Sequence, residues 1–288
     1  MGHSGLAWSV EPNPRYHAFA PIPPLAHLIE EIWVQEGEVD PEASPAEMGS
    51  TAILPAARAD LVLNWGDPFV ELRLEGEIPI PRAAIIGPRT ERWEVRGTGS
   101  CGLIIVCFHP WAGGPLLGAD LTASAGGLLS IGDVYGDARE RALLDCAGSE
   151  QRVALVQQML LQWLEDRETD RLSAATAVAI HRAGGRARVK EVAAHLGMSR
   201  RHLQRRVTQA IGIPPKKLAS LARVHRVIGR LRSGEPEWQV AGDCGYADQS
   251  HLIREVRSFT GMTPTALRQV ANEGLVDAFN NDGVSRYL

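Results

Sequence analysis

Two patterns of apolar and polar residues divide the chain, and the change falls near residue 128. Before it, short apolar runs rich in β-branched and aromatic residues alternate with Gly and Pro turns. These runs are TAILP, ADLVLNW, FVELRLEG, AAIIG, RWEVRG and CGLIIVCFH. They predict an antiparallel sandwich or barrel of about six strands. The last run is continuously apolar, which predicts a central strand buried on both faces.

A different spacing precedes these runs. In LAHLIEEIWVQEG the apolar residues recur at the three- and four-residue intervals of a helix, at Leu25, Leu28, Ile29, Ile32 and Trp33. We therefore expect a helix in this segment. The acidic, Pro-containing stretch 37–50 that follows is expected to be a loop.

From about residue 128 onward the apolar period is helical. The clearest case is one expected buried stripe, formed by Val153, Val156, Met159, Leu160 and Trp163. The expected fold class is α+β with two domains: a β-rich N-terminal domain with trailing helices, then an all-α domain. We place the N-terminal domain at 1–170, a linker at 171–185, the all-α domain at 186–272 and a tail at 273–288.

The second half contains an internal repeat. VAAHLGMS (192–199) matches VAGDCGYAD (240–248), and SRRHLQRRVTQAIGIPP (199–215) matches DQSHLIREVRSFTGMTP (248–264). The offset is 48 residues before the turn and 49 after it, so the second turn is one residue longer. Each copy predicts a short helix, a turn at a glycine, a polar N-cap and a second helix. This is helix-turn-helix geometry, in which the second helix lies in a DNA major groove.

Matching positions of the two copies have matching expected roles. Ser199 and Asp248 are expected N-caps. The expected buried pairs are Leu203 with Leu252 and Val207 with Val256, and the expected helix-ending pairs are Gly197 with Gly245 and Gly212 with Gly261. Between the copies, residues 216–234 predict one amphipathic helix with apolar Leu218, Leu221, Val224 and Leu231.

The two second helices expose different side chains. The first carries Arg200, Arg201, Gln204, Arg205 and Thr208, which are donors suited to base edges and phosphates. The second carries Gln249, Ser250, Ile253, Arg254 and Arg257. Ile253 is apolar and can meet only groove shape or a thymine methyl group. We therefore expect the second helix to contribute mostly backbone contacts.

The charge of the chain is distributed very unequally. The net charge is −4 over 288 residues, but residues 1–170 carry 11 Arg, no Lys and 25 acidic residues, a charge of −14. Residues 171–288 carry 19 Lys and Arg and 9 acidic residues, a charge of +10. A basic half predicts a polyanionic partner, here double-stranded DNA. The acidic half either repels DNA or covers the basic face in an inactive state.

Residues ~183–270 resemble the DNA-binding domain of the AraC/XylS family of bacterial transcription regulators. The segments that carry the resemblance are SRRHLQRRVTQAIGIPPKKLASLARVHRV and GYADQSHLIREVRSFTGMTPTALR. The resemblance implies two helix-turn-helix units that enter successive major grooves. It implies base contacts from Arg201, Gln204 and Arg205 and from Gln249, Ser250 and Ile253. Phosphate contacts are expected from Arg200, Lys216, Lys217, Arg254 and Arg257.

The N-terminal half is similar to sensor-like domains that precede this module in one branch of the family. The similarity rests on LAHLIEEIWVQEG, ILPAARADLVLNWGDPF, IIGPRT and IIVCFHPWAGGPLLG. It implies binding of a small-molecule effector or self-association as a homodimer, and RNA polymerase is a further candidate partner. Because the mouths of barrels commonly hold ligands, an effector pocket is expected at Asn64, Trp65, Arg89, Trp93, His109 and Trp111.

Two alternatives remain open for the N-terminal half: it binds a protein partner, or it is an enzyme that carries a DNA-targeting module. Its Gly-rich segments match neither a P-loop nor a dinucleotide fingerprint. Cys107 and His109 would share one strand face as a thiol–imidazole pair, although core packing explains them more simply. The four Cys do not have metal-site spacing, so we expect no metal. Because no catalytic or nucleotide-binding motif is present, we also expect no catalysis and no cofactor. No signal peptide or membrane span is evident, and we expect a cytoplasmic protein.

Overall fold

A computed structural model describes residues 16–37, 51–113, 127–146, 148–165, 171–184 and 189–272. The stretch 38–50, expected as a loop, and the tail 273–288 lie outside the described residues. Within the described part of the chain, no helix is both long enough and apolar enough to cross a membrane.

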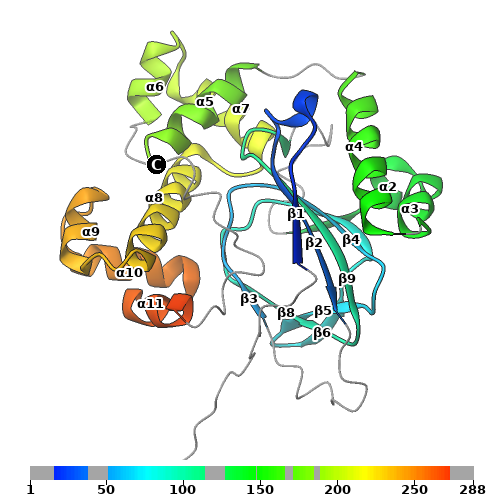
Figure 1. Ribbon diagram of the computed structural model, residues 1–288. Coiled ribbons are helices and arrows are strands. Elements are labelled where there is room, and N and C mark those ends of the chain that lie inside the picture. Colours follow the sequence, from blue (N-terminus) through cyan, green and yellow to red (C-terminus); the bar gives the residue numbers. More distant parts are fainter. Residues whose placement is uncertain are drawn as a thin grey trace, which may run out of the picture.

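The N-terminal half is a sandwich of two antiparallel sheets (Figure 1). The larger sheet contains, in spatial order, β1 (Tyr16–Phe19), β2 (Ile29–Gly37), β9 (Cys101–Phe108), β4 (Asp60–Asn64), β7 (Ala83–Ile86) and β10 (Leu128–Ser130). The smaller sheet contains β3 (Thr51–Ile53), β8 (Trp93–Gly97), β5 (Phe69–Arg73) and β6 (Gly76–Pro79). The expected β-rich sandwich is therefore confirmed, and its two sheets are not closed into a barrel.

The six expected runs all contain strands, and β1, β2, β6 and β10 are additional. As expected, β9 lies inside the larger sheet between β2 and β4 and is buried along nearly its whole length. Ile104, Val106 and Phe108 join the larger apolar cluster on one face, whereas Leu103 and Ile105 join a second cluster on the opposite face. Burial on both faces explains why the run is continuously apolar.

The helix expected at 25–37 is wrong. Pro23–Leu25 forms the short 3₁₀ helix η1, and Ile29–Gly37 forms strand β2, which pairs with β9 over its length. The pairing register shifts between Ile29 and Glu31, as at a β-bulge. Because a bulge adds one residue, apolar Ile29 and Ile32 share one face although three positions separate them. That interval imitates a helical period.

Three helices cover the outer face of the larger sheet: α2 (Ile131–Tyr135), α3 (Asp137–Leu144) and α4 (Ser149–Glu165). The expected stripe on α4 is confirmed, because Val153, Val156, Met159, Leu160 and Trp163 are all buried against this sheet. Figure 1 shows these helices on one side of the sandwich and α8–α11 on the other.

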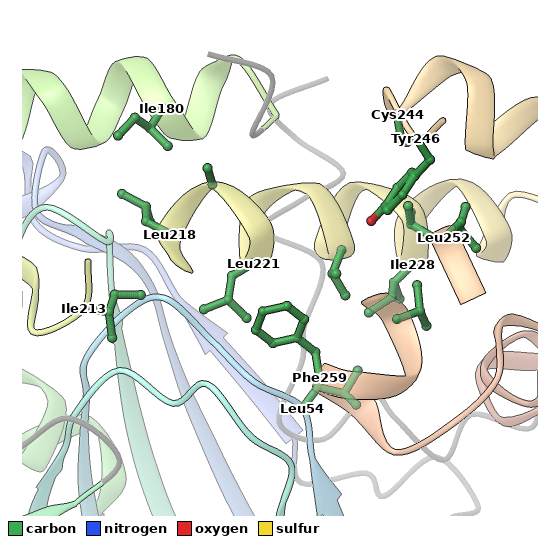
Figure 2. Packing of buried hydrophobic residues seen from close by; sticks show 14 of the residues in the cluster. Leu54, Ile180, Ile213, Leu218, Leu221, Ile228, Cys244, Tyr246, Leu252 and Phe259 are labelled. Atoms are coloured by element: carbon green, nitrogen blue, oxygen red, sulfur yellow. The ribbon is translucent and has the colours of Figure 1, made fainter. Parts of the chain in front are cut away.

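The C-terminal half is helical and has its own apolar core. It consists of α5 (Arg171–Arg182), α6 (Val189–His195), α7 (Arg200–Ile211), α8 (Pro215–Arg232), α9 (Glu237–Asp243), α10 (Gln249–Thr260) and α11 (Pro264–Asn272). The stretch expected as a linker, 171–185, is mostly helix α5 instead. Ala177 and Ile180 of α5 are completely buried in the C-terminal core, so this helix packs with the helices of the two repeat units. Figure 2 shows Ile180 beside Leu218 of α8.

Candidate nucleic-acid interface and effector cavity

The two repeat units have the same local construction. The side chains of Ser199 and Asp248 cap α7 and α10, accepting hydrogen bonds from the backbone N–H groups of His202 and His251. Both N-cap predictions are therefore confirmed. Gly212 and Gly261 end these helices in the left-handed conformation, with φ of 88° and 72°. A residue with a Cβ is strained there, which explains glycine at both positions.

The first turns of the two units also match in hydrogen bonding. After α6, Met198 N–H donates to the Ala193 carbonyl at 2.9 Å and Gly197 N–H donates to the Ala194 carbonyl at 3.1 Å. After α9, Tyr246 N–H donates to the Ala241 carbonyl at 3.0 Å and Gly245 N–H donates to the Gly242 carbonyl at 3.1 Å. Both pairs form a Schellman motif. Leu203, Val207, Leu252 and Val256 are buried, as the repeat predicts.

Helix α7 presents an open polar and cationic face. Arg200, Arg201, Gln204 and Arg205 are exposed, and Thr208 is half-buried. Leu203, Val207 and Ile211 anchor the opposite face in the core. The described residues of the N-terminal domain therefore do not cover this face of α7. The expectation that the acidic half covers the basic face is not met by the part of the chain that the structure describes.

Helix α10 presents a face that is already partly engaged. Gln249 Nε2 donates to Glu237 Oε2 of α9 at 3.0 Å, and Arg254 Nε donates to the Ser250 carbonyl of its own helix at 3.2 Å. Ile253 is half-buried and packs against the C-terminal core. Ser250 and Arg257 are exposed.

Helix α8 joins the two units and holds α10 by an ion pair. Arg223 donates from Nε and Nη2 to the two carboxylate oxygens of Glu255 at 2.9 and 2.8 Å, and Ser220 Oγ donates to Glu255 at 3.0 Å. Burial opposes the charged form, but these hydrogen bonds outweigh it and lower the pKa of Glu255. At the start of α8, Lys216 and Lys217 are exposed.

A cavity of about 40 Å³ lies between the two sheets of the N-terminal sandwich. Three of the six expected effector residues line it: Asn64, Arg89 and Trp93. Asn64 is occupied by the turn that follows β4, because its Nδ2 donates to the Asp67 carbonyl and its Oδ1 accepts from Gly66 N–H. The Arg89 guanidinium carbon lies 5.6 Å from the centroid of the Trp93 ring.

The other three expected effector residues lie elsewhere. Trp65 packs on the helix-covered face of the larger sheet, where the Arg152 guanidinium lies 4.3 Å from its ring centroid. His109 and Trp111 stack on each other at 4.5 Å between ring centroids. Trp111 also meets His181 of α5 edge to face, so this pair contacts the C-terminal half instead of the cavity.

Sequence reasoning missed the charged core of the cavity. Arg58 donates to Asp60 and to Glu30, each at 3.0 Å, and Arg89 donates to the second oxygen of Asp60 at 3.2 Å. Asp60 and Arg89 are 5% and 7% exposed, which is rare for charged residues in a sandwich interior. The available signal was Asp60, a charged residue in the largely apolar run ADLVLNW. Because every second side chain of a strand lies on the same face, Asp60 shares the cavity face of β4 with Val62 and Asn64.

Residues 54–58, hereafter the 54–58 segment, connect the cavity to the C-terminal half. Leu54 belongs to the C-terminal apolar core, as Figure 2 shows. His225 Nε2 of α8 donates to the Pro55 carbonyl at 2.6 Å. The Ala56 carbonyl accepts from Arg89 N–H at 2.8 Å, and Arg58 lines the cavity. One short segment therefore contributes Arg58 to the cavity, pairs with Arg89 and contacts the helix that joins the two repeat units.

Cys107 and His109, considered above as an alternative thiol–imidazole pair, do not form one site. Cys107 lines the cavity, where Arg58 Nη2 donates to its sulfur at 3.3 Å, whereas His109 stacks on Trp111 at the contact between the two halves. Burial raises the pKa of the Cys107 thiol to about 12. A thiol of this pKa is protonated at neutral pH and is a poor nucleophile.

Comparison with known families agrees with this arrangement. A model described as a helix-turn-helix domain matches residues 192–269, and a model described as a domain of unknown function (DUF6597) matches residues 17–127. The fold and these matches define a two-domain protein with paired helix-turn-helix units. In particular, the C-terminal module is an AraC-type helix-turn-helix domain, which confirms the resemblance to the AraC/XylS regulators.

Several solved structures are similar to this chain. ToxT from Vibrio cholerae is 10% identical over 90% of this chain and 98% of its own, with a TM-score of 0.44. An AraC-type transcriptional regulator from Chromobacterium violaceum is 24% identical over 35% of this chain and 93% of its own, with a TM-score of 0.32. The C-terminal domain of AraT from Geobacillus stearothermophilus is 22% identical over 34% and 84%, with a TM-score of 0.33. No curated protein matches the chain.

Proposed function

We propose that this protein is a sequence-specific transcription regulator whose N-terminal sandwich senses an effector. The observation that carries the proposal is the 54–58 segment, which contacts the sandwich cavity through Arg58 and the DNA-binding core through Leu54. A rearrangement at the cavity therefore has a short physical route to α8. We place the domain boundary between α4 and α5, because α5 packs in the C-terminal core.

Base recognition is assigned mainly to the first unit. Arg201, Gln204 and Arg205 are exposed on α7, and such side chains make bidentate contacts with guanine and adenine. Lys216, Lys217 and Arg257 are exposed and are assigned to phosphates. Arg200 and Arg254 are assigned to phosphates as well.

Selection of binding sites from a random DNA pool with the full chain tests the DNA-binding proposal. We expect a selected site that footprinting shows to be protected on one face, with an affinity that falls steeply as salt rises. Enrichment of no sequence, with equal affinity for all DNA, would overturn the proposal of sequence-specific regulation.

The contact between His225 and the 54–58 segment makes the docking of the two halves sensitive to acid. Burial lowers the pKa of His225 from 6.5 to about 4. An imidazole released to water takes up a proton below pH 6.5, so docking is strongest above that pH and weakens as the pH falls toward 4. The loss is at most about 3 kcal/mol for a shift of this size. Arg58, His181 and Glu30 also act on this imidazole.

Hydrogen exchange of the 54–58 segment and α8, measured at neutral pH and at roughly pH 5, checks this dependence. We expect smaller protection factors in acid, that is, less protection relative to the intrinsic exchange rate at each pH. His225→Gln retains an N–H donor for Pro55 but does not titrate, so its protection factors should change less with pH. The matched control is His195→Gln, since His195 is exposed on α6. Equal acid sensitivity of both variants would contradict a role for His225.

A further inference from the structure

We propose that the cavity between the two sheets binds a small carboxylate and that Arg89 holds it. This inference deepens the proposed sensor function and rests on it. It follows from three observations that concern the donors of Arg89, the charges around it, and the walls and size of the cavity.

Arg89 has donors without acceptors. Its Nη2 donates to Asp60, but its Nε and Nη1 are buried and have no hydrogen-bond partner among the residues that the structure describes. A buried donor without a partner costs about 1–3 kcal/mol, and more when the group is charged. A side chain that is 7% exposed cannot recover this energy from bulk water, so the two N–H groups suit an anion inside the cavity.

Arg89 also shares its carboxylate partner. Among the residues that the structure describes it pairs with Asp60, which also pairs with Arg58, and Arg58 has Glu30 as a second partner. The two guanidinium groups and the two carboxylates balance in charge, but Arg89 has only a share of one carboxylate. Burial lowers the pKa of Arg89, yet a guanidinium in a protein stays protonated. Cys107 offers no anionic acceptor, because burial keeps its thiol protonated. A bound carboxylate would be a second anionic acceptor for Arg89.

The walls and the volume define the rest of the ligand. The cavity is otherwise lined largely by apolar side chains, among them Val62, Phe69, Ile86 and Leu103. Its volume of about 40 Å³ corresponds to roughly three water positions, since each needs about 10–15 Å³. A short aliphatic carboxylate fits both the volume and the apolar walls. A long-chain acid would require the sheets to move apart.

Occupancy of this cavity has a route to the DNA-binding half. The backbone N–H of Arg89 pairs with Ala56, next to Pro55 and His225. Drawing the Arg89 guanidinium toward a ligand would also change its hold on Asp60, and so the position of Arg58. Ala56 and Arg58 of the 54–58 segment would therefore both respond to the ligand.

Calorimetric titration of the full chain with acetate, propionate and butyrate tests the proposal, with butyramide as the neutral isostere. We expect a carboxylate to bind at least about tenfold more tightly than the amide, because charge-assisted hydrogen bonds to Arg89 are lost with the amide. Arg89→Met should abolish this preference. Arg73→Met, which removes an exposed arginine of the smaller sheet, should retain it.

A second variant guards against misfolding of Arg89→Met. Arg89→Lys keeps a cation beside Asp60 but loses the planar set of donors, so we expect weaker carboxylate binding with a folded circular-dichroism spectrum. Equal binding of butyrate and butyramide, no binding of any acid, or undiminished binding by Arg89→Lys would overturn the proposal. If the acids fail while site selection yields a DNA sequence, the ligand assignment alone is wrong. If selection also fails, the regulator function itself is wrong.

Discussion

Helices α7 and α10 occupy equivalent positions in two copies of one scaffold, but their exposed surfaces are in different states. Both begin at a side-chain cap, bury their apolar residues at the same positions and end at a left-handed glycine. On α7 the candidate base-reading side chains are exposed, whereas on α10 Gln249 is held by Glu237 and Ile253 packs inward. Repetition of a fold therefore does not imply repetition of its function. The capping residues and the buried apolar residues determine the fold of each unit. The exposed side chains that have no partner within the protein determine what the unit can recognise.

The largest expected effect concerns the attachment of α10 to α8. Glu255→Ala leaves Arg223 half-buried without its carboxylate, so we expect the free energy of unfolding to fall by about 2–3 kcal/mol. Urea unfolding of the full chain measures this loss. Hydrogen exchange should show more loss of protection in α10 than in α7.

Ser258→Ala is the matched control for Glu255→Ala, because Ser258 is exposed on the same helix and its hydroxyl donates to the Glu255 carbonyl one turn away. We expect it to change stability by less than about 0.5 kcal/mol. If the two variants were equally stable, the ion pair would not be what positions α10.

The next effect compares base reading by the two helices. Arg201→Ala or Gln204→Ala should weaken binding to the selected site by about 1–3 kcal/mol more than binding to random DNA. Gln249→Ala should cause a smaller specific loss, because Gln249 must first leave Glu237. Competition binding with selected and random duplexes measures both. A larger specific loss for Gln249→Ala would reverse the assignment of the reading helix.

The smallest effect concerns phosphate contacts, independent of sequence, from α8, the helix that joins the two units. Lys217→Ala should weaken selected and random DNA alike and reduce the salt dependence by about one unit of slope, as for one lost phosphate contact. The Lys217 ammonium lies 5.1 Å from the centroid of the Phe259 ring, so a thermal melt must confirm an intact core. A loss confined to the selected site would instead place Lys217 at a base.

The parts of the fold that the sequence predicted depend on local interactions. Caps, glycine-ended helices and the buried stripe on α4 each involve residues that are close in sequence, so spacing reveals them. The helix expected at 25–37 failed because the bulge at Ile29 and Glu31 arises from pairing with β9, far away in the chain. An apolar interval of three cannot by itself distinguish a helical turn from a strand with an extra residue.

The candidate effector site was predicted only in part for a related reason. Arg89 and Trp93 were predicted and line the cavity. Arg58 and Asp60 were missed, because their ion pairs join separate strands and loops. The contact between Pro55 and His225 spans 170 residues of sequence. Such a contact leaves no periodic trace in either segment.

The position of Leu54 has a consequence for inheritance of the two domains. A residue encoded with the sandwich completes the apolar core of the DNA-binding helices, and α5 contributes Ala177 and Ile180 to the same core. Exchanging N-terminal domains between relatives by joining genes near residue 185 would therefore transfer part of the apolar core of the C-terminal helices together with the N-terminal domain. Functional recombinants of this protein should therefore keep residue 54 and α5 from the same parent as the helix-turn-helix units. The segment that can be exchanged between relatives is then larger than the two helix-turn-helix units alone.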